Sequence, residues 1–154
     1  MKLSRKTDYA LRVLCTLAEH YQQGPIPIRE LARRNDVPKR FLEHIMLDLK
    51  AQGWVDSAAG KLGGYVLARR PDKITMGQVV RYFDGQLAPI TCVSASHYER
   101  CTQESLCRFR RVLLDIRNHT TRLTDQTTLA AIIASEPVRR KEVFADGFVA
   151  GDGI

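Results

Sequence analysis

The stretch IRELARRNDVPKRFLEHIMLDLKAQG, residues 28–53, decides the fold. Apolar residues recur at three- and four-residue spacing over residues 28–34 and again over residues 38–52, which predicts two helices. The buried face of the second helix is expected to contain Phe41, Leu42, Ile45, Met46 and Leu49. The segment Asn35-Asp36-Val37 between them predicts a tight turn, a proline suits the start of the second helix, and Gly53 ends it. Two short helices around such a turn predict a helix-turn-helix, whose second helix enters the major groove of DNA.

The second of these helices carries residue types that bind DNA on its outward positions. They are Lys39, Arg40, Glu43, His44 and Lys50. Lysine and arginine pair with phosphates, arginine also with guanine, and glutamate accepts a hydrogen bond from cytosine. A solvated helix face would carry the same residues, so this helix by itself leaves both interpretations open.

Two short strands, over residues 54–57 and 65–68, follow directly after that helix. The segment between them holds three glycines and a lysine, and glycine lets a backbone turn tightly and approach a phosphate closely. A strand, a glycine-rich turn with a cation and a return strand at this place predict the wing of a winged helix. The wing residues that we expect to contact DNA are Lys61, Gly63, Gly64 and Tyr65.

A helix expected before this motif begins after Ser4, which suits an N-cap, and stops before Gly24. Arg5 and Lys6 lie in its first turn, where the helix macrodipole disfavours cations but favours a docked anion such as a DNA phosphate. Both are therefore candidate DNA contacts, together with Arg29 in the following helix.

The rest of the chain is expected to be helical around one loop. Thr75 suits the N-cap of a fourth helix that Gly85 ends, and residues 88–107 are polar and weakly periodic, as in a loop. A long helix over about residues 104–123 has more apolar surface than a peripheral helix needs, so we expect it to pair with a second chain. Its apolar residues are Leu106, Phe109, Val112, Leu113, Ile116 and Leu123. A short helix over residues 129–134 follows.

The fold class that follows is mainly α with a small β-wing: a winged helix-turn-helix plus a long C-terminal dimerisation helix. We expect a DNA-binding domain over residues 1–85, the cysteine loop and dimerisation helix over residues 86–135, and a flexible tail over residues 136–154. The charge is uneven, since residues 1–75 hold 14 Lys and Arg against 8 Asp and Glu, whereas residues 76–154 hold 10 against 9. A basic half beside a nearly neutral one favours a polyanionic partner.

Several protein classes find no support in the sequence. It has no run of ~18 apolar residues that would span a membrane and no apolar stretch typical of a signal peptide, so we expect a cytoplasmic protein. It also shows no nucleophile paired with a base and an orienting group, no phosphate-binding glycine loop and no His-Glu-x-x-His pattern. We therefore expect no enzyme.

Three cysteines are spaced Cys-x8-Cys-x5-Cys within the expected loop: Cys92, Cys101 and Cys107. Thiolates are soft ligands, and one flexible segment can wrap them around a metal centre, which favours an iron–sulfur cluster. Zinc usually requires a fourth Cys or His and a closer pair of ligands; His97 and His119 lie nearby. A thiol switch and incidental cysteines stay open as well. Cys15 falls in the apolar stripe of the first helix and is expected in the core.

Several segments together resemble the Rrf-type winged-helix transcription regulators. They are residues 1–12 (MKLSRKTDYALR), Phe41-Leu42-Glu43, Gly63-Gly64-Tyr65, Ile74-Thr75-Met76-Gly77 and Thr128-Leu129-Ala130. The resemblance covers roughly residues 1–135 in unbroken order. It implies a homodimer on a partly palindromic operator, crossed by the long C-terminal helix, with the three loop cysteines as ligands of an iron–sulfur cluster.

The fourth cluster ligand differs among members of this family. The iron–sulfur cluster regulator takes a His three residues past its last Cys, where this chain has Arg110. The nitric-oxide-sensitive repressor takes an Asp from the first helix of the other protomer, where this chain has Asp8, so the resemblance implies Asp8 as the ligand, supplied in trans. The first cysteine gap is closer to that of the rhizobial iron regulator. Many members carry an Arg just before the wing glycines; this chain has Ala58-Ala59, and Lys61 would substitute as a phosphate contact.

These features predict a homodimeric DNA-binding transcription regulator that acts as a repressor. Its binding to a double-stranded operator would be controlled by a 4Fe–4S or 2Fe–2S cluster that senses iron, redox or nitric oxide status. The alternative is a metal-free or zinc-stabilised, thiol-based regulator or interaction module.

Overall fold

The computed structural model describes residues 2–60 and 63–143. Lys61 of the wing and residues 144–154 of the expected tail lie outside this part of the chain. In chain order the helices are α1 (Arg5–Glu19), α2 (Ile28–Asn35), α3 (Lys39–Ala51), α4 (Met76–Asp84), α5 (Arg110–Gln126), α6 (Leu129–Ala134) and α7 (Arg140–Val143). The strands β1 (Val55–Ala58) and β2 (Gly64–Leu67) lie between α3 and α4, and short 3-10 turns cover Pro71–Lys73 and Thr91–Val93.

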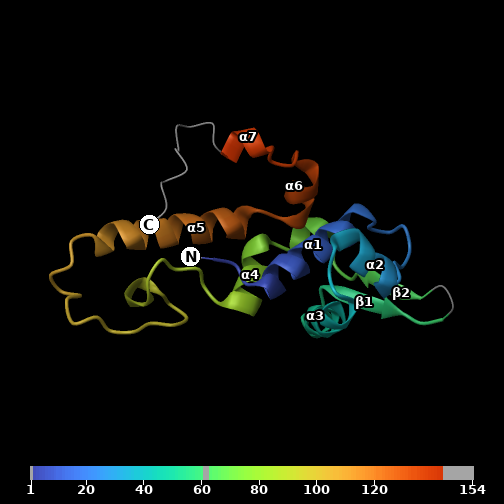
Figure 1. Cartoon of the computed structure of the whole chain (residues 1–154), viewed down its shortest axis with the longest axis horizontal. Coiled ribbons are helices and arrows are strands. Elements are labelled where there is room, and N and C mark those ends of the chain that lie inside the picture. Colours follow the sequence, from blue (N-terminus) through green and yellow to red (C-terminus); the bar gives the residue numbers. More distant parts are fainter. Residues whose placement is uncertain (1, 61–62, 144–154) are drawn as a thin grey trace.

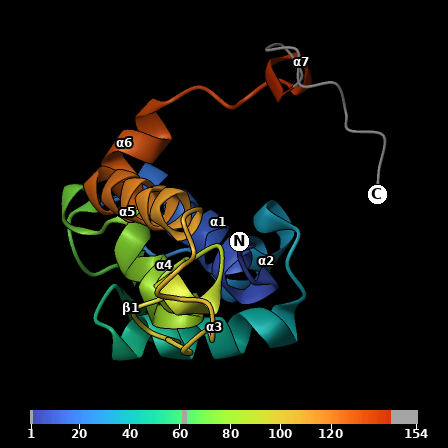
Figure 2. The ribbon, with the colours of Figure 1, turned by 90° about the vertical axis from the view of Figure 1, so that its left-hand side faces the viewer.

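The molecule is elongated, with a helical head at one end and the long helix α5 leading away from it (Figure 1). The head contains α1 to α4 and the two strands. The loop between α4 and α5 extends along α5 to the far end of this helix, where α5 begins, so the cysteine-containing segment lies away from the strands. In the view along the long axis, α3 lies on the opposite side of the head from α5 and α6 (Figure 2). This arrangement separates the predicted DNA-binding end from the end that holds the cysteine loop.

Side-chain caps fix where several helices begin. Ser4 caps α1 by accepting a hydrogen bond from the Thr7 amide, and Thr128 caps α6 in the same way. Thr75 forms a full capping box with Gln78 at the start of α4. Each cap satisfies amide groups that a helix leaves unpaired at its N-terminus, so the predicted starts after Ser4 and Thr75 are confirmed.

One hydrophobic core lies inside the head. It is formed by the inward faces of α1, α2 and α3, the strands, α4 and the distant helix α6. The fully buried large side chains include Leu14, Leu31, Leu42, Ile45, Met46, Leu49, Ile74, Val79 and Leu129. Because Leu129 is 0% exposed, α6 belongs to this core although it follows α5 in the chain.

The two strands form an antiparallel hairpin with Val55 opposite Leu67 and Ala58 opposite Gly64. An isolated bridge joins Ile26, just before α2, to Tyr65 on β2. Gly64 has to be a glycine at this crossing, because a Cβ there would lie 2.3 Å from the carbonyl oxygen of Ile26. The bridge therefore fixes the base of the wing against the start of α2.

Three details differ from the sequence-based expectation. The long helix begins at Arg110 rather than near Glu104, because Arg110 hydrogen-bonds to the Cys92 carbonyl and pairs with Glu104, which holds the preceding residues in the loop. Phe41, expected in the buried face of α3, is 42% exposed and packs edge-on against Tyr9. The beginning of the expected tail contains the short, exposed helix α7.

Within residues 2–60 and 63–143, no helix is both long enough and apolar enough to cross a membrane.

Candidate DNA-binding surface and cysteine clefts

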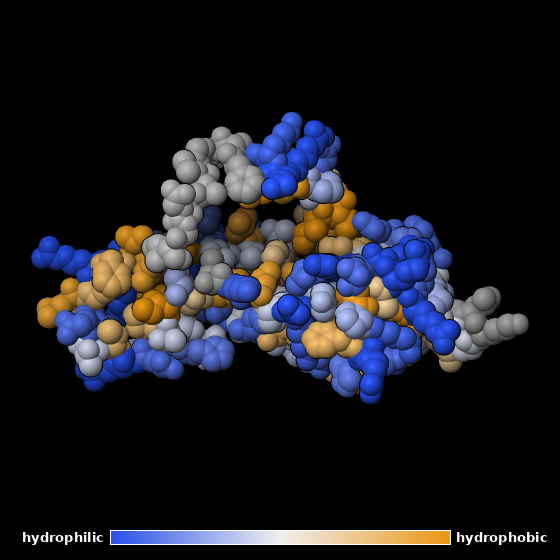
Figure 3. All heavy atoms as spheres, viewed as in Figure 1, coloured by the Kyte–Doolittle hydropathy of each residue, from blue (hydrophilic) through white to orange (hydrophobic). Residues whose placement is uncertain are grey.

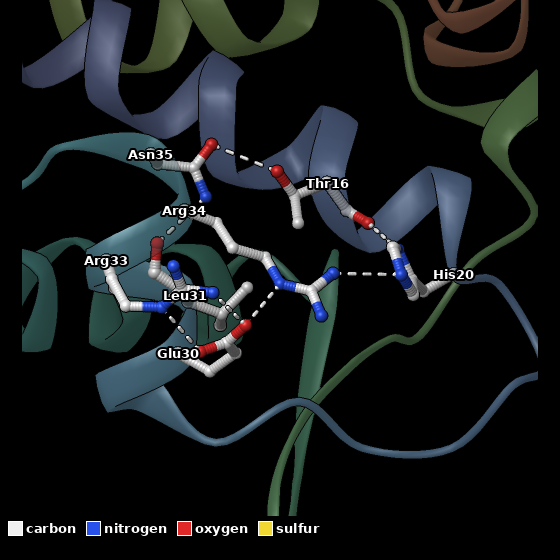
Figure 4. Close-up of polar contacts among 7 residues, drawn as sticks. All are labelled: Thr16, His20, Glu30, Leu31, Arg33, Arg34 and Asn35. Atoms are coloured by element: carbon white, nitrogen blue, oxygen red, sulfur yellow. Dashed lines mark hydrogen bonds and ion pairs between the residues drawn. The ribbon is translucent and has the colours of Figure 1, made fainter.

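A polar network fastens α2 to α1 and so places the helix-turn-helix (Figure 4). Arg34 Nη1 lies 3.0 Å from His20 Nε2, and His20 Nδ1 lies 2.9 Å from the Thr16 carbonyl oxygen. Because a guanidinium only donates, Nε2 accepts and Nδ1 carries the proton donated to Thr16. Thr16 also donates to the buried Asn35 amide oxygen at 3.0 Å. The last turn of α2 is thereby held against α1.

Glu30 completes this network within α2. Its carboxylate accepts from Arg33 at 2.8 Å and from Arg34 at 2.7 Å. These hydrogen bonds, that of Arg33 foremost, lower the pKa of Glu30 to about 2. Glu30 therefore stays ionised at any ordinary pH and orients both arginine side chains.

The face of α3 that points away from the core contains the predicted DNA-binding residues. Lys39 and Glu43 form an ion pair at 2.7 Å, and hydrogen bonding to Lys39 lowers the pKa of Glu43. His44 Nδ1 lies 2.8 Å from the Arg40 carbonyl oxygen. In the part of the chain that the structure describes, the Arg40 guanidinium forms no hydrogen bond or ion pair. Arg40 is exposed on this face.

The predicted residues of the first turn of α1 differ in their surroundings. Arg5 is exposed. Lys6 Nζ instead lies 2.7 Å from Asp48 of α3 and 5.3 Å from the centre of the Phe83 ring. Lys6 therefore joins α1, α3 and α4, a role that the sequence did not reveal.

The base of the wing and the start of α2 surround an open hollow of ≈ 370 Å³. Arg29, Gly63, Gly64 and Tyr65, all predicted DNA contacts, line it together with Ser57. The N-cap of α2 is Pro27, which makes no side-chain cap, and the Glu30 amide donates to the Pro27 carbonyl at 2.9 Å, so the Ile28 and Arg29 amides are left without a side-chain acceptor. Uncapped amides beside an arginine form a site that suits a phosphate.

The cysteines lie in two adjoining clefts at the start of α5. Cys92 and Cys107 line the larger one, of ≈ 440 Å³, and the exposed Cys101 lines the smaller one, of ≈ 290 Å³. Tyr98, Glu104 and Arg110 line both. Among the residues that the structure describes, no three His, Cys, Asp or Glu side chains are close enough together to hold a metal ion.

Arginines dominate the larger cleft: Arg108, Arg110, Arg111 and Arg117. Two of them hold the loop on α5, since Arg110 donates to the Cys92 carbonyl at 2.8 Å and Arg117 to the Val93 carbonyl at 3.0 Å. The N-cap of α5 has no side-chain hydrogen bond, and no acidic residue lies in the first turn. Cations at an uncapped helix N-terminus repel the macrodipole, so this end favours an anion. The seven-residue spacing of Arg110 and Arg117 was the signal that sequence reasoning missed.

An iron–sulfur cluster fits these residues by the kind of donors and by charge. Thiolates are the usual ligands of such clusters, and a cluster bound by three thiolates is anionic, which the arginines would balance. The positions fit less well, because Cys101 faces a cleft separate from that of Cys92 and Cys107. Asp8, the expected ligand in trans, accepts a bidentate hydrogen bond from Arg12 of its own helix, with a shortest distance of 2.7 Å.

Comparison with known proteins supplies the context for these two sites. Residues 3–135 match the family model described as "Rrf2: Iron-dependent Transcriptional regulator". The chain is 37% identical to a putative HTH-type transcriptional regulator rrf2-like from Rhodobacter capsulatus over 86% of its own length and 93% of that protein. It is 32% identical to the HTH-type transcriptional regulator NsrR from Geobacillus kaustophilus, with coverages of 86% and 90%.

Solved structures agree with the sequence comparisons. The structure is similar to that of CymR, the global cysteine regulator of Bacillus subtilis, with a TM-score of 0.74 and 27% identity. That match covers 89% of this chain and 99% of CymR. The mainly helical fold with its small wing is therefore that of the winged-helix regulators, and the chain belongs to the Rrf2 family of DNA-binding transcription regulators.

Proposed function

We propose that the protein is a homodimeric, cytoplasmic repressor whose binding to operator DNA is controlled by an iron–sulfur cluster on Cys92, Cys101 and Cys107. The observation that carries the cluster assignment is the gathering of all three thiols in two adjoining clefts beside four arginines at the uncapped start of α5. When bound, the cluster would supply a group that gains or loses electrons or reacts with nitric oxide.

The DNA contacts follow from the exposed surface of the head. α3 would lie in the major groove with Arg40 and Glu43 at base edges, while Arg5 and the start of α2 with Arg29 would meet phosphates. Arg40→Ala should weaken binding to the operator by about 1–3 kcal/mol and relax specificity at one position. Lys61→Ala should weaken binding to all sequences about equally and reduce the salt dependence by about one unit of slope.

The homodimer rests on an exposed apolar stripe of α5. Val112, Ile116 and Leu123 are 58%, 41% and 58% exposed and lie on one helix face with His119 between them. No side chain of this 17-residue helix is buried within the described chain, and Figure 3 shows apolar side chains at the surface along it. Ile116→Glu should yield a monomer by analytical ultracentrifugation, whereas Asn118→Glu, which places the same charge off the stripe, should leave the dimer intact.

The cluster is tested by anaerobic purification followed by visible absorption and by iron and sulfide analysis. Serine substitution at Cys92, Cys101 or Cys107 should abolish or impair cluster retention, because each thiolate fills a coordination site. Cys15→Ala serves as the control, because Cys15 packs against the core of the head. A triple loop variant with full iron and sulfide content would end the cluster assignment.

Asp8 of the other protomer is the proposed fourth ligand. Such a bond would connect the cysteine end of one chain with α1 of the other, and it requires Asp8 to leave Arg12. Asp8→Ala should give a labile or spectrally altered cluster and operator binding that no longer responds to cluster loss. An unchanged spectrum with an intact response to cluster loss would instead assign the fourth ligand to His97, His119 or a small molecule.

A metal-free thiol regulator is the second candidate. It is favoured by the separation of Cys101 from the other two thiols and by the similarity to CymR, described as a global cysteine regulator. In that case the anaerobically purified protein would be colourless, and operator binding would depend on thiol oxidation or on a bound partner alone.

A further inference from the structure

One large apolar side chain lies in the middle of the polar DNA-binding face of α3. Leu47 is 65% exposed, more than any other large apolar side chain among the described residues of the head. It follows Arg40 by seven residues, Glu43 by four and His44 by three. Residues at these spacings share one helix face. The buried residues of α3 point the other way: Leu42, Ile45, Met46 and Leu49.

Contacts within the chain leave Leu47 uncovered. α3 packs against α1, α2 and β1. Helix α5 lies on the opposite side of the molecule from α3, as Figures 1 and 2 both show, so the proposed pairing of two chains along α5 would leave Leu47 free. The other exposed apolar residue of α3, Phe41, differs, because it packs edge-on against Tyr9. Leu47 therefore faces whatever binds the exposed side of α3.

The major groove of DNA offers one apolar group to such a side chain, the 5-methyl group of thymine. We propose that Leu47 is a specificity-determining residue that packs against a thymine methyl group in each half of the operator. This inference rests on the proposed role of α3 as the recognition helix. Leu47 stands about 10 Å along the helix from Arg40, at 1.5 Å per residue. That span is about three base-pair steps of 3.4 Å, so the thymine should lie about three pairs from the base that Arg40 contacts.

The test uses a duplex that the full-length protein selects from a random pool, with its thymines replaced one at a time by deoxyuridine. This change removes only the methyl group. At one thymine in each half-site, the replacement should weaken binding of the parent by about fourfold, the effect of exposing one CH₂-sized group. Leu47→Ala should bind the thymine and deoxyuridine forms equally. Phe41→Ala is the matched control and should keep the parent's discrimination.

The outcomes separate this inference from the function on which it rests. Equal deoxyuridine effects in the parent and in Leu47→Ala at every thymine would overturn the inference while leaving a sequence-specific regulator. A Leu47→Ala variant that weakens all DNA sequences equally would overturn it as well. A parent that selects no sequence from the pool would instead contradict the proposed function. Thermal unfolding of Leu47→Ala should match the parent, because the side chain is exposed.

Discussion

The four cysteines differ in what surrounds each sulfur. Cys101 is exposed, Cys92 is buried and Cys15 is half-buried. Burial, and to a lesser degree the charge of Glu19, raises the pKa of the Cys15 thiol. Since the thiolate is the reactive form, a thiol with a raised pKa that is also shielded reacts slowly.

Brief alkylation of reduced, cluster-free protein should therefore modify Cys101 first and Cys15 and Cys92 last, as read by peptide mass spectrometry. In denaturant the differences should vanish. Native Cys15 reacting as fast as Cys101 would contradict the described packing of α1. Loading with a cluster should protect Cys101 together with Cys92 and Cys107 if all three are ligands.

Glu30 provides a pH-dependent readout of the α2 network. Its pKa of about 2 in the folded protein lies below the ordinary value for glutamate. The pairing therefore contributes stability that is complete at neutral pH and is lost as the pH falls from about 4.3 toward 2. In an NMR titration, the Glu30 carboxylate should remain ionised well below the ordinary glutamate range near 4.3.

The control for Glu30 is the double variant Arg33→Gln, Arg34→Gln. Without both guanidinium groups the Glu30 titration should return toward the ordinary range near 4.3. An ordinary pKa in the parent itself would show that the hydrogen bonds of Figure 4 do not persist in solution.

At the scale of elements, the base of the wing depends on one close approach of two backbones. The Ile26 amide donates to the Tyr65 carbonyl at 3.0 Å, and the Tyr65 amide donates back at 2.9 Å. A methyl group at Gly64 would collide with Ile26 and Pro27 and separate these partners. Gly64→Ala should lower the free energy of unfolding by about 1–3 kcal/mol, as overpacking does, measured by urea denaturation. Ser57→Ala on the facing strand is exposed and should change it by less than about 0.5 kcal/mol.

Most elements could be predicted from the sequence because their signals are local. The caps Ser4, Thr75 and Thr128 and the stop at Gly85 place helix ends by contacts within a few residues. The start of α5 could not be predicted in this way. It depends on the hydrogen bond from Arg110 to the carbonyl oxygen of Cys92, eighteen residues earlier in the chain. The spacing of apolar residues does not predict such a long-range contact. The ion pair between Lys6 and Asp48 could not be predicted either, because its partners are far apart in the chain.

The sequence predicted which residues form the candidate cysteine site, but not how they are arranged. Cysteine spacing identified the three thiols, but their distribution over two clefts depends on how the loop folds against Tyr98, Glu104 and Arg110. Leu47 escaped notice because apolar residues on a predicted helix are ordinarily assigned to the core. Its exposure agrees with its helical spacing from Arg40, Glu43 and His44, which already places it on the outward face.

At the scale of the whole molecule, α6 connects the end of α5 to the head. The Leu129 amide donates to the Ile74 carbonyl at 2.9 Å, and the Met76 amide donates to the Thr127 carbonyl at 2.8 Å. Leu129→Ala should lower the free energy of unfolding by about 2–5 kcal/mol, because it leaves a cavity at a fully buried position. Leu106→Ala is the same chemical change at a side chain that is 77% exposed, and it should cost less than about 0.5 kcal/mol. Equal losses in the two variants would contradict the packing of α6 in the core.

The late position of α6 in the chain has a consequence for how the protein is made. A ribosome synthesises a protein from the N-terminus to the C-terminus, and earlier segments begin to fold while later ones are still being synthesised. Residues 5–84, which form α1 to α4 and both strands, are synthesised first, but the core that Leu129 completes cannot form until the cysteine loop and α5 have followed. A nascent chain therefore presents its three loop thiols to the surrounding medium before its head has reached full stability.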